Sequence, residues 1–387
     1  MLPHTIPPKK KRRMPQSVPT FPFLDLQRVN AAYEPMLSDA IARTVASGWY
    51  LNGAELARFE REFAAFAGAD YCVGVGNGLD ALTLALLALK QLRKWEDGDE
   101  VILPAMTFVA TAEAVVRAGL HPILCDITPD FLINPAAAEQ AITPRTRAII
   151  PVHLYGKACD MQALRTIAER HGLALVEDAA QAHGAWESKG CRVGSGEVVA
   201  FSFYPGKNLG ALGDGGAVVT RHADLARHIR TLANYGAEQK YEHRFHGMNS
   251  RLDEVQAAAL RVKLPHLDAD NARRQALAAI YSREIKHPAV RIPYGGATDS
   301  SVFHIYPVLC KHRAALQQHL SAHGVQTLVH YPHPIHRQGA FASLCPGSFP
   351  VAEQVAAECL SLPISPVQTA EETHIIATLI NQFDYDA

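Results

Sequence analysis

Short apolar runs alternate with amphipathic helical patterns from about residue 68 to residue 220. In the first helical pattern Leu82, Ala85, Leu86 and Leu89 recur at the spacing of one helix face. Strands that alternate with helices of about ten residues are typical of βαβ units and of a mainly parallel sheet covered on both faces. We therefore expect an α/β fold, with strands near 71–74, 101–103, 122–125, 148–152, 173–176 and 199–203 and helices near 80–92, 110–118 and 161–171.

The pattern changes after residue 220. It predicts a helix over 225–235 and a long helical stretch over 252–284 that is kinked near Pro265. The later elements are predicted as strands at 302–309 and 327–330 and helices at 314–323, near 351–360 and at 370–382. We interpret residues 20–250 as a large domain and residues 251–387 as a smaller C-terminal α/β domain.

Residues 1–19 are rich in proline and contain the basic run from Lys9 to Arg13. Such a segment cannot bury a core, so we expect a disordered basic tail. A localisation or polyanion-binding tag is the alternative. A secretory signal is not expected, because no apolar stretch follows the basic residues.

Composition and charge narrow the classes of function. The chain has 387 residues, of which 48% are hydrophobic and 19% charged, which is enough apolar material for a core. Its 37 Lys and Arg residues balance 38 Asp and Glu residues, which argues against nucleic acid or an anionic membrane as the partner. No apolar run reaches the roughly 20 residues that span a bilayer. Seven cysteines without a CxxC pair indicate neither a disulfide framework nor a zinc site, so we expect a cytoplasmic protein without a metal.

Three common ligand motifs are incomplete in this chain. Residues 74–78 (GVGNG) resemble a dinucleotide-binding turn, but Leu79 stands where GxGxxG needs glycine. What remains is a helix N-terminus that can bind an anion such as phosphate, or a tight structural turn. Asn208 replaces the Ser or Thr that a P-loop needs after its lysine. Prolines in the histidine-rich stretch 330–336 prevent a helical metal motif and favour a loop at a polar cleft.

Asp178 and Lys207 are the most specific candidate pair. Asp178 ends an apolar run, and a buried carboxylate needs a positive partner. Lys207 follows the expected strand 199–203 on a Pro-Gly turn, with Ser202 five residues earlier and a glycine-rich turn after it. The set predicts pyridoxal 5′-phosphate (PLP), with Lys207 as the Schiff-base lysine and Asp178 as the partner of the protonated pyridine nitrogen. Ser202 and the N–H groups around Gly78 would then hold the phosphate.

Six stretches of the chain are long enough to compare with known families. They are GNGLDAL (76–82), PAMTFVAT (104–111), PVHLYGKACDM (151–161), EDAAQAHGA (177–185), FSFYPGKNLGALGDGGA (201–217) and GMNSRLDEVQAA (247–258). Together they resemble the DegT-type nucleotide-sugar aminotransferases, which are fold-type I PLP enzymes. The resemblance runs from about residue 21 to residue 340.

The resemblance implies roles for individual residues and an obligate homodimer with shared active sites. It makes Lys207 the cofactor-linked lysine and Asp178 the partner of the pyridine nitrogen. The other residues that match the family's cofactor contacts are Gln181 beside the 3-hydroxyl, Gly78 and Leu79 as backbone phosphate donors, Ser202 as a side-chain donor, Phe108 stacked on the ring, and Asn249 as a phosphate contact from the neighbouring subunit.

The residues of these motifs are most similar to those of enzymes that aminate C3 of a dTDP-3-keto-6-deoxyhexose with L-glutamate. It implies Tyr204 and His330 as residues on the substrate side, while Lys157 departs from the family's pattern. An aminotransferase for a 4-keto or UDP-linked sugar is the main alternative. A PLP-dependent sugar dehydratase would carry His in place of Lys207, and a non-catalytic PLP-binding regulator would usually carry an extra effector module.

Overall fold

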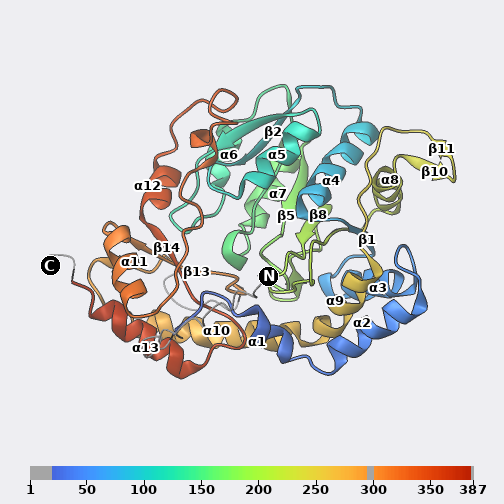
Figure 1. The fold of residues 1–387 in the computed structure, drawn as a ribbon. Coiled ribbons are helices and arrows are strands. Elements are labelled where there is room, and N and C mark those ends of the chain that lie inside the picture. Colours follow the sequence, from blue (N-terminus) through green and yellow to red (C-terminus); the bar gives the residue numbers. More distant parts are fainter. Residues whose placement is uncertain (1–19, 294–299, 385–387) are drawn as a thin grey trace, which may run out of the picture.

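The computed structural model describes residues 20–293 and 300–384, so the tail predicted for residues 1–19 lies outside the described residues. Its centre is a seven-stranded sheet with the strand order β1-β9-β8-β5-β4-β2-β3 (Figure 1). Strand β9 pairs antiparallel with β1 and β8, and the other pairs in this sheet are parallel. The predicted mainly parallel sheet is therefore confirmed. Its strands are β1 (Tyr71–Val75), β2 (Glu100–Pro104), β3 (His121–Cys125), β4 (Thr146–Ile149), β5 (Ala174–Asp178), β8 (Val198–Ser202) and β9 (Gly216–Thr220).

Both faces of the sheet are buried, as a parallel sheet requires. Successive side chains of β8 enter different hydrophobic clusters: Val198 and Ala200 belong to one, Val199 and Phe201 to the other. On each face of the sheet the cluster includes, among others, the apolar residues of two helices. These helices are α4 (Gly78–Arg93) and α8 (Ala223–Ala233) on one face, and α3 (Ala54–Ala67) and α9 (Glu254–Lys263) on the other; α5 (Val109–Arg117), α6 (Pro135–Gln140) and α7 (Met161–His171) complete the crossovers.

The predicted kink near Pro265 is confirmed. A short 3-10 turn, η2 (Leu264–His266), separates α9 from α10 (Leu267–Glu284), because proline cannot donate the next helical hydrogen bond. Figure 1 shows α10 along the base of the molecule, where it packs against α13 (Ala370–Asn381). A second, antiparallel sheet follows. It contains β12 (Val290–Arg291), β13 (Tyr306–Cys310) and β14 (Cys359–Leu362), and it is accompanied by α11 (Arg313–Ala322) and α12 (Pro350–Glu358).

Two strand predictions after residue 300 need correction. The strand predicted over 302–309 begins only at Tyr306, because Val302 donates its N–H to Gly156 and Phe303 has a φ of 41° that interrupts the extended backbone. Residues 327–330 form no strand, and Leu328 makes only an isolated bridge with Ser361. One hydrophobic cluster also extends from the large sheet into the second sheet, so the two-domain division stays a prediction.

The remaining elements lie at the N-terminus and in the connections. Helices α1 (Leu26–Ala31) and α2 (Met36–Ser47) precede α3, and two small hairpins pair β6 (Trp186–Ser188) with β7 (Cys191–Arg192) and β10 (Ala237–Gln239) with β11 (Glu242–His243). Single 3-10 turns occur at η1 (Leu154–Gly156) and η3 (Ile335–Arg337). Among the helices of the described residues, none combines the length and the apolar character that crossing a membrane requires.

Candidate active site

A cavity of about 720 Å³ opens at the carboxyl ends of β5 and β8, where an α/β sheet of this kind binds ligands. Nine of the ten site residues predicted from the sequence line it. They are Gly78, Leu79, Phe108, Asp178, Gln181, Ser202, Tyr204, Lys207 and His330. The walls come from the N-terminus of α4, the start of α5, the loop between β8 and β9, and the segments around residues 304 and 330.

Lys207 lies on the loop that joins β8 to the antiparallel β9. Its backbone N–H donates to the carbonyl of Tyr204 at 2.8 Å, which closes a tight turn. The turn then passes so close to itself that a Cβ on Gly210 would lie 2.2 Å from the carbonyl oxygen of Pro205. Burial lowers the pKa of the Lys207 amine to about 8, and the charge of Asp178 partly opposes this. A buried amine of this kind is suited to attack a carbonyl.

Asp178 is the last residue of β5 and is almost fully buried. Its Oδ2 accepts a hydrogen bond from the Thr111 hydroxyl at 2.8 Å, and its Oδ1 accepts one from the backbone N–H of Ala180 at 3.1 Å. Burial raises the pKa of the Asp178 carboxyl, while these hydrogen bonds and the nearby Lys207 oppose the rise. The Asp178 carboxylate forms no ion pair with any described residue, so a cation brought by a ligand would complete it.

The N-terminus of α4 lies close to Ser202, and both line the cavity. Asn77 caps the helix, and its side chain accepts a hydrogen bond from the Asp80 N–H at 2.8 Å. A Cβ on Gly78 would lie 2.6 Å from the Cβ of Ser202, so only glycine lets the hydroxyl approach the first turn. Free backbone N–H groups next to a serine hydroxyl form a binding site for phosphate.

Gln181, Phe108 and Tyr331 also line the cavity. The Gln181 Oε1 accepts from the Tyr155 N–H at 2.7 Å, and its Nε2 donates to the Tyr331 hydroxyl at 3.0 Å. The rings of Phe108 and Tyr331 lie 5.5 Å apart at an angle of 35°, and Phe108 is half exposed toward the cavity. An aromatic ring at this place can stack on a planar ligand.

The two residues predicted on the substrate side differ in their surroundings. His330 pairs through Nδ1 with the Ser361 hydroxyl at 2.9 Å, and burial together with Lys207 lowers its pKa to about 4. Tyr204 is largely exposed and lines the cavity. Their contacts with a substrate stay a prediction.

Three further residues that line the cavity were not identified from the sequence: Arg274, His304 and Tyr331. Thr111, which bonds to Asp178 behind the cavity wall, was not identified either. Thr111 is the last residue of one of the quoted motifs, and Tyr331 directly follows the predicted site residue His330. The position of each in the sequence could therefore have identified it as a site residue. Arg274 on α10 and His304 before β13 come from the C-terminal part of the chain, and no local pattern marks them.

Asn249 does not line this cavity. It is exposed and forms a backbone bridge with Asn234, so its predicted contact with a neighbouring subunit is not tested by one chain. In the described part of the chain no cluster of three or more His, Cys, Asp and Glu residues could hold a metal ion.

The comparisons with known proteins agree with this geometry. Residues 34–380 match the model of the DegT/DnrJ/EryC1/StrS aminotransferase family. The chain belongs to this family. It is 55% identical to the erythromycin biosynthesis sensory transduction protein EryC1 of Saccharopolyspora erythraea, over 92% of this chain and 98% of the relative.

Two further relatives carry the names of sugar transaminases. The dTDP-3-amino-3,4,6-trideoxy-α-D-glucose transaminase of Streptomyces venezuelae is 51% identical over 90% of this chain and 92% of the relative. The dTDP-3-amino-3,6-dideoxy-α-D-galactopyranose transaminase of Aneurinibacillus thermoaerophilus is 47% identical over 94% of this chain and 99% of the relative.

Solved structures give the same fold. DesV of S. venezuelae, solved with a ketimine intermediate, superposes with a TM-score of 0.91 at 47% identity, covering 95% of this chain and all of that one. NtdA of Bacillus subtilis, solved with the cofactor PMP, superposes with a TM-score of 0.85 at 29% identity, covering 95% of this chain and 86% of that one. The chain is a PLP-dependent aminotransferase, as the sequence predicted.

The residues of the cavity fit the cofactor. The uncompensated Asp178 carboxylate suits a protonated pyridine nitrogen, and the close approach of Gly78 and Ser202 leaves N–H and O–H donors for the phosphate. The individual cofactor contacts stay predictions for all of these residues: Gly78, Leu79, Phe108, Asp178, Gln181, Ser202, Lys207 and Asn249.

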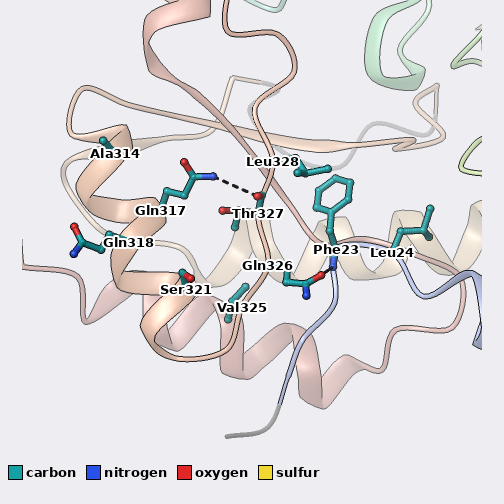
Figure 2. Close-up of a pocket in the computed structure, with 10 residues that line it drawn as sticks. All are labelled: Phe23, Leu24, Ala314, Gln317, Gln318, Ser321, Val325, Gln326, Thr327 and Leu328. Carbon is teal, nitrogen blue, oxygen red and sulfur yellow. Dashed lines mark hydrogen bonds between the residues drawn. The ribbon is translucent and has the colours of Figure 1, made fainter.

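A second hollow of about 710 Å³ adjoins the active-site cavity of this aminotransferase and shares Phe23, Leu24 and Leu328 with it (Figure 2). Within residues 20–293 and 300–384, no charged side chain lines it. Figure 2 shows Gln317 and Gln318 on one side and Phe23 on the other, with Gln317 donating to the Thr327 carbonyl and the Phe23 N–H donating to Gln326. This neutral groove therefore offers amide and hydroxyl groups next to an aromatic ring.

Proposed function

We propose that this aminotransferase moves the amino group of L-glutamate to C3 of a dTDP-3-keto-6-deoxyhexose and forms a dTDP-3-amino-3,6-dideoxyhexose for glycan or antibiotic biosynthesis. The observation that carries the proposal is the intact pair of Lys207 and Asp178 in one cavity, in a chain about half identical to two dTDP-3-amino-sugar transaminases.

Lys207 has the central role in this proposal. The bound cofactor supplies an aldehyde and an electron-poor ring, which Asp178 keeps protonated. The amine of Lys207, whose pKa burial lowers to about 8, removes the proton from Cα of the amino donor and later delivers a proton to C3 of the sugar. The same residue thus serves both halves of a ping-pong reaction.

The amino donor is an anion, and positive groups line the cavity. Arg274 is buried, and its Nη1 donates to the carbonyls of Ile364 at 2.8 Å and Phe303 at 3.4 Å. Its Nε and Nη2 make no hydrogen bond to any described residue and remain available to a ligand. A planar guanidinium binds a carboxylate through two parallel hydrogen bonds, which supports L-glutamate as the donor.

The nucleotide needs room beyond the cofactor and the sugar. The neutral groove next to the cavity supports a nucleotide-linked substrate, because a nucleobase is uncharged and pairs with amides. We place the nucleoside of the substrate there, between Phe23 and the glutamines of α11.

A homodimer with shared sites is part of the proposal. Large aromatic side chains at the cavity mouth and near α2 are more than half exposed, which supports a subunit interface over this face. They are Trp49, Tyr50, Phe108 and Tyr204. Asn249 would then reach the phosphate of the neighbouring subunit, and we place the enzyme in the cytoplasm with its nucleotide-sugar substrates.

The test is product analysis with purified enzyme, PLP, L-glutamate and a panel of dTDP- and UDP-linked 3-keto and 4-keto sugars. We expect a mass gain for amination only with the dTDP-3-keto sugars, nitrogen at C3 by NMR, and no product from Lys207→Ala. Amination of a 4-keto sugar instead would overturn the assigned position. Cofactor binding without any product would favour a regulatory role. The relative EryC1 carries the name of a sensory transduction protein.

A further inference from the structure

His304 is a partly buried imidazole of the active-site cavity whose role the preceding sections leave open. It precedes β13, in the segment where the predicted strand is interrupted, and it lines the same cavity as Lys207. The bend at Phe303 is what brings the ring into the cavity instead of leaving it in a regular strand.

The hydrogen bonds of Asn208 fix which nitrogen of His304 carries the proton. The Asn208 Nδ2 donates to the carbonyl of Val302 at 3.0 Å and to the Oδ1 of Asn271 at 2.9 Å. Because the carbonyl can only accept, the orientation of the Asn208 amide is settled. Its Oδ1 therefore faces the Nδ1 of His304 at 3.1 Å and must accept a hydrogen from it. The Nε2 of His304 is left with a lone pair.

The lone pair of Nε2 has no partner among the described residues of the chain. Burial lowers the pKa of His304 well below its usual value, and the positive charges of Lys207 and Arg274 lower it further, followed by His330 and His183. The imidazole therefore stays neutral and can only accept at Nε2. A carboxylate or a diphosphate cannot satisfy it, because both are acceptors themselves.

We propose that the Nε2 of His304 accepts a hydrogen bond from a sugar hydroxyl next to the carbon that is aminated, so that His304 selects substrates by the presence of that hydroxyl. This inference rests on the proposed function. The free groups of L-glutamate are acceptors apart from the amine that reacts, whereas the keto sugar brings hydroxyl donors. The sugar ring must come close to His304, because the sugar carbon that is aminated has to approach Lys207. Lys207 and His304 line the same cavity, and the charge of Lys207 lowers the pKa of the imidazole.

The test uses the reverse half-reaction, in which the PLP form of the enzyme takes the amino group from a dTDP-3-amino-3,6-dideoxyhexose. Its rate is compared with those of the 2-deoxy and 4-deoxy counterparts, in the wild-type enzyme and in His304→Phe. In the wild type we expect one deoxy sugar to lose about tenfold in kcat/KM, since one buried hydrogen bond is lost. In His304→Phe we expect that this difference disappears, because no acceptor is left unpaired.

His304→Gln is the matched variant, since its amide oxygen can accept a hydrogen bond and should restore part of the preference. Calorimetry should give the same result for binding of the corresponding unreactive 3-hydroxy sugars. Removal of the hydroxyl should raise the Kd in the wild type but not in His304→Phe, and a loss of folding would not produce this difference. An unchanged preference in His304→Phe, or equal rates for all three sugars in the wild type, overturns the role of His304. Failure of the wild type to react with any 3-amino sugar would instead overturn the proposed function.

Discussion

The hydroxyl of Thr111, on α5, donates a 2.8 Å hydrogen bond to Oδ2 of Asp178, at the end of β5. Both side chains are buried, and the hydroxyl of Thr107 lies 2.9 Å from that of Thr111. The carboxylate that is to hold the protonated cofactor thus depends on a residue 67 positions earlier in the chain. A hydrogen bond to the charged form of an acid favours that form.

Replacement of Thr111 by Val should weaken cofactor binding. The hydrogen bond from Thr111 lowers the pKa of Asp178 against the effect of burial, so its loss raises that pKa and destabilises the charged form that would hold the pyridinium. We expect the free energy of PLP binding to weaken by about 1 kcal/mol, which is roughly a fivefold to tenfold rise in the Kd, while the fold stays intact. Equilibrium dialysis measures the Kd, and Thr107→Val serves as the control. An equal effect of both variants would contradict a specific role of Thr111.

The reactivity of Lys207 toward PLP should depend on pH with a midpoint near 8. Only the neutral amine attacks an aldehyde, and burial lowers the pKa of Lys207 from 10.5 to about 8. The rate of adduct formation in the cofactor-free enzyme should therefore rise as the pH increases through 8 and level off above it. Borohydride trapping and peptide mass spectrometry measure the adduct, and Lys207→Ala corrects for other lysines. A midpoint near 10.5 would contradict this environment.

The sequence predicted those parts of the fold that local patterns determine. The strands from Tyr71 to Asp178 are largely buried and form apolar runs between helices, which is why their predicted positions agree with the structure to within a few residues. Strand β9 was not predicted, because residues 213–217 were interpreted as a glycine-rich turn whose backbone packs against something bulky. In the structure a Cβ on Gly216 would lie 2.4 Å from the carbonyl oxygen of Asn77, so close packing explains the glycine.

The candidate site also contains residues that the sequence identified and residues that it did not. Lys207 and Asp178 were identified because each follows an apolar run within a long motif. His304 and Arg274 were not, since tertiary contacts alone bring them to the cavity. The backbone turns at Phe303 because the Val302 N–H bonds to the carbonyl of Gly156. The local sequence of residues 302–309 does not predict that contact.

Glu254 should stabilise the fold by capping a helix from a distance. Gly53 is the N-cap of α3 and has no side chain to cap it. The Glu254 carboxylate of α9 accepts instead from the N–H groups of Gly53, Glu55 and Leu56 at 2.8–3.0 Å. Glu254→Ala leaves these donors without a partner, so we expect a loss of about 2–4 kcal/mol in the free energy of unfolding. Urea unfolding measures it, and the exposed Glu169 gives the control Glu169→Ala, which should change little. Equal losses in both variants would contradict the capping role.

Lys263 should make stability rise with pH above 8. Its buried Nζ donates to the Gly210 carbonyl at 2.7 Å and to Asn30 at 2.8 Å, and burial lowers its pKa from 10.5 to about 8. Between these values the unfolded chain holds a proton that the folded chain has released, so folding gains as the pH rises. Relative to Lys263→Met, the free energy of unfolding of the wild-type holoenzyme should increase by up to about 3 kcal/mol from pH 7.5 to 10.5. Urea unfolding across this range measures the difference, with the exposed Lys311→Met as control. A difference that stays constant with pH would show that the Lys263 ammonium is not destabilised by burial.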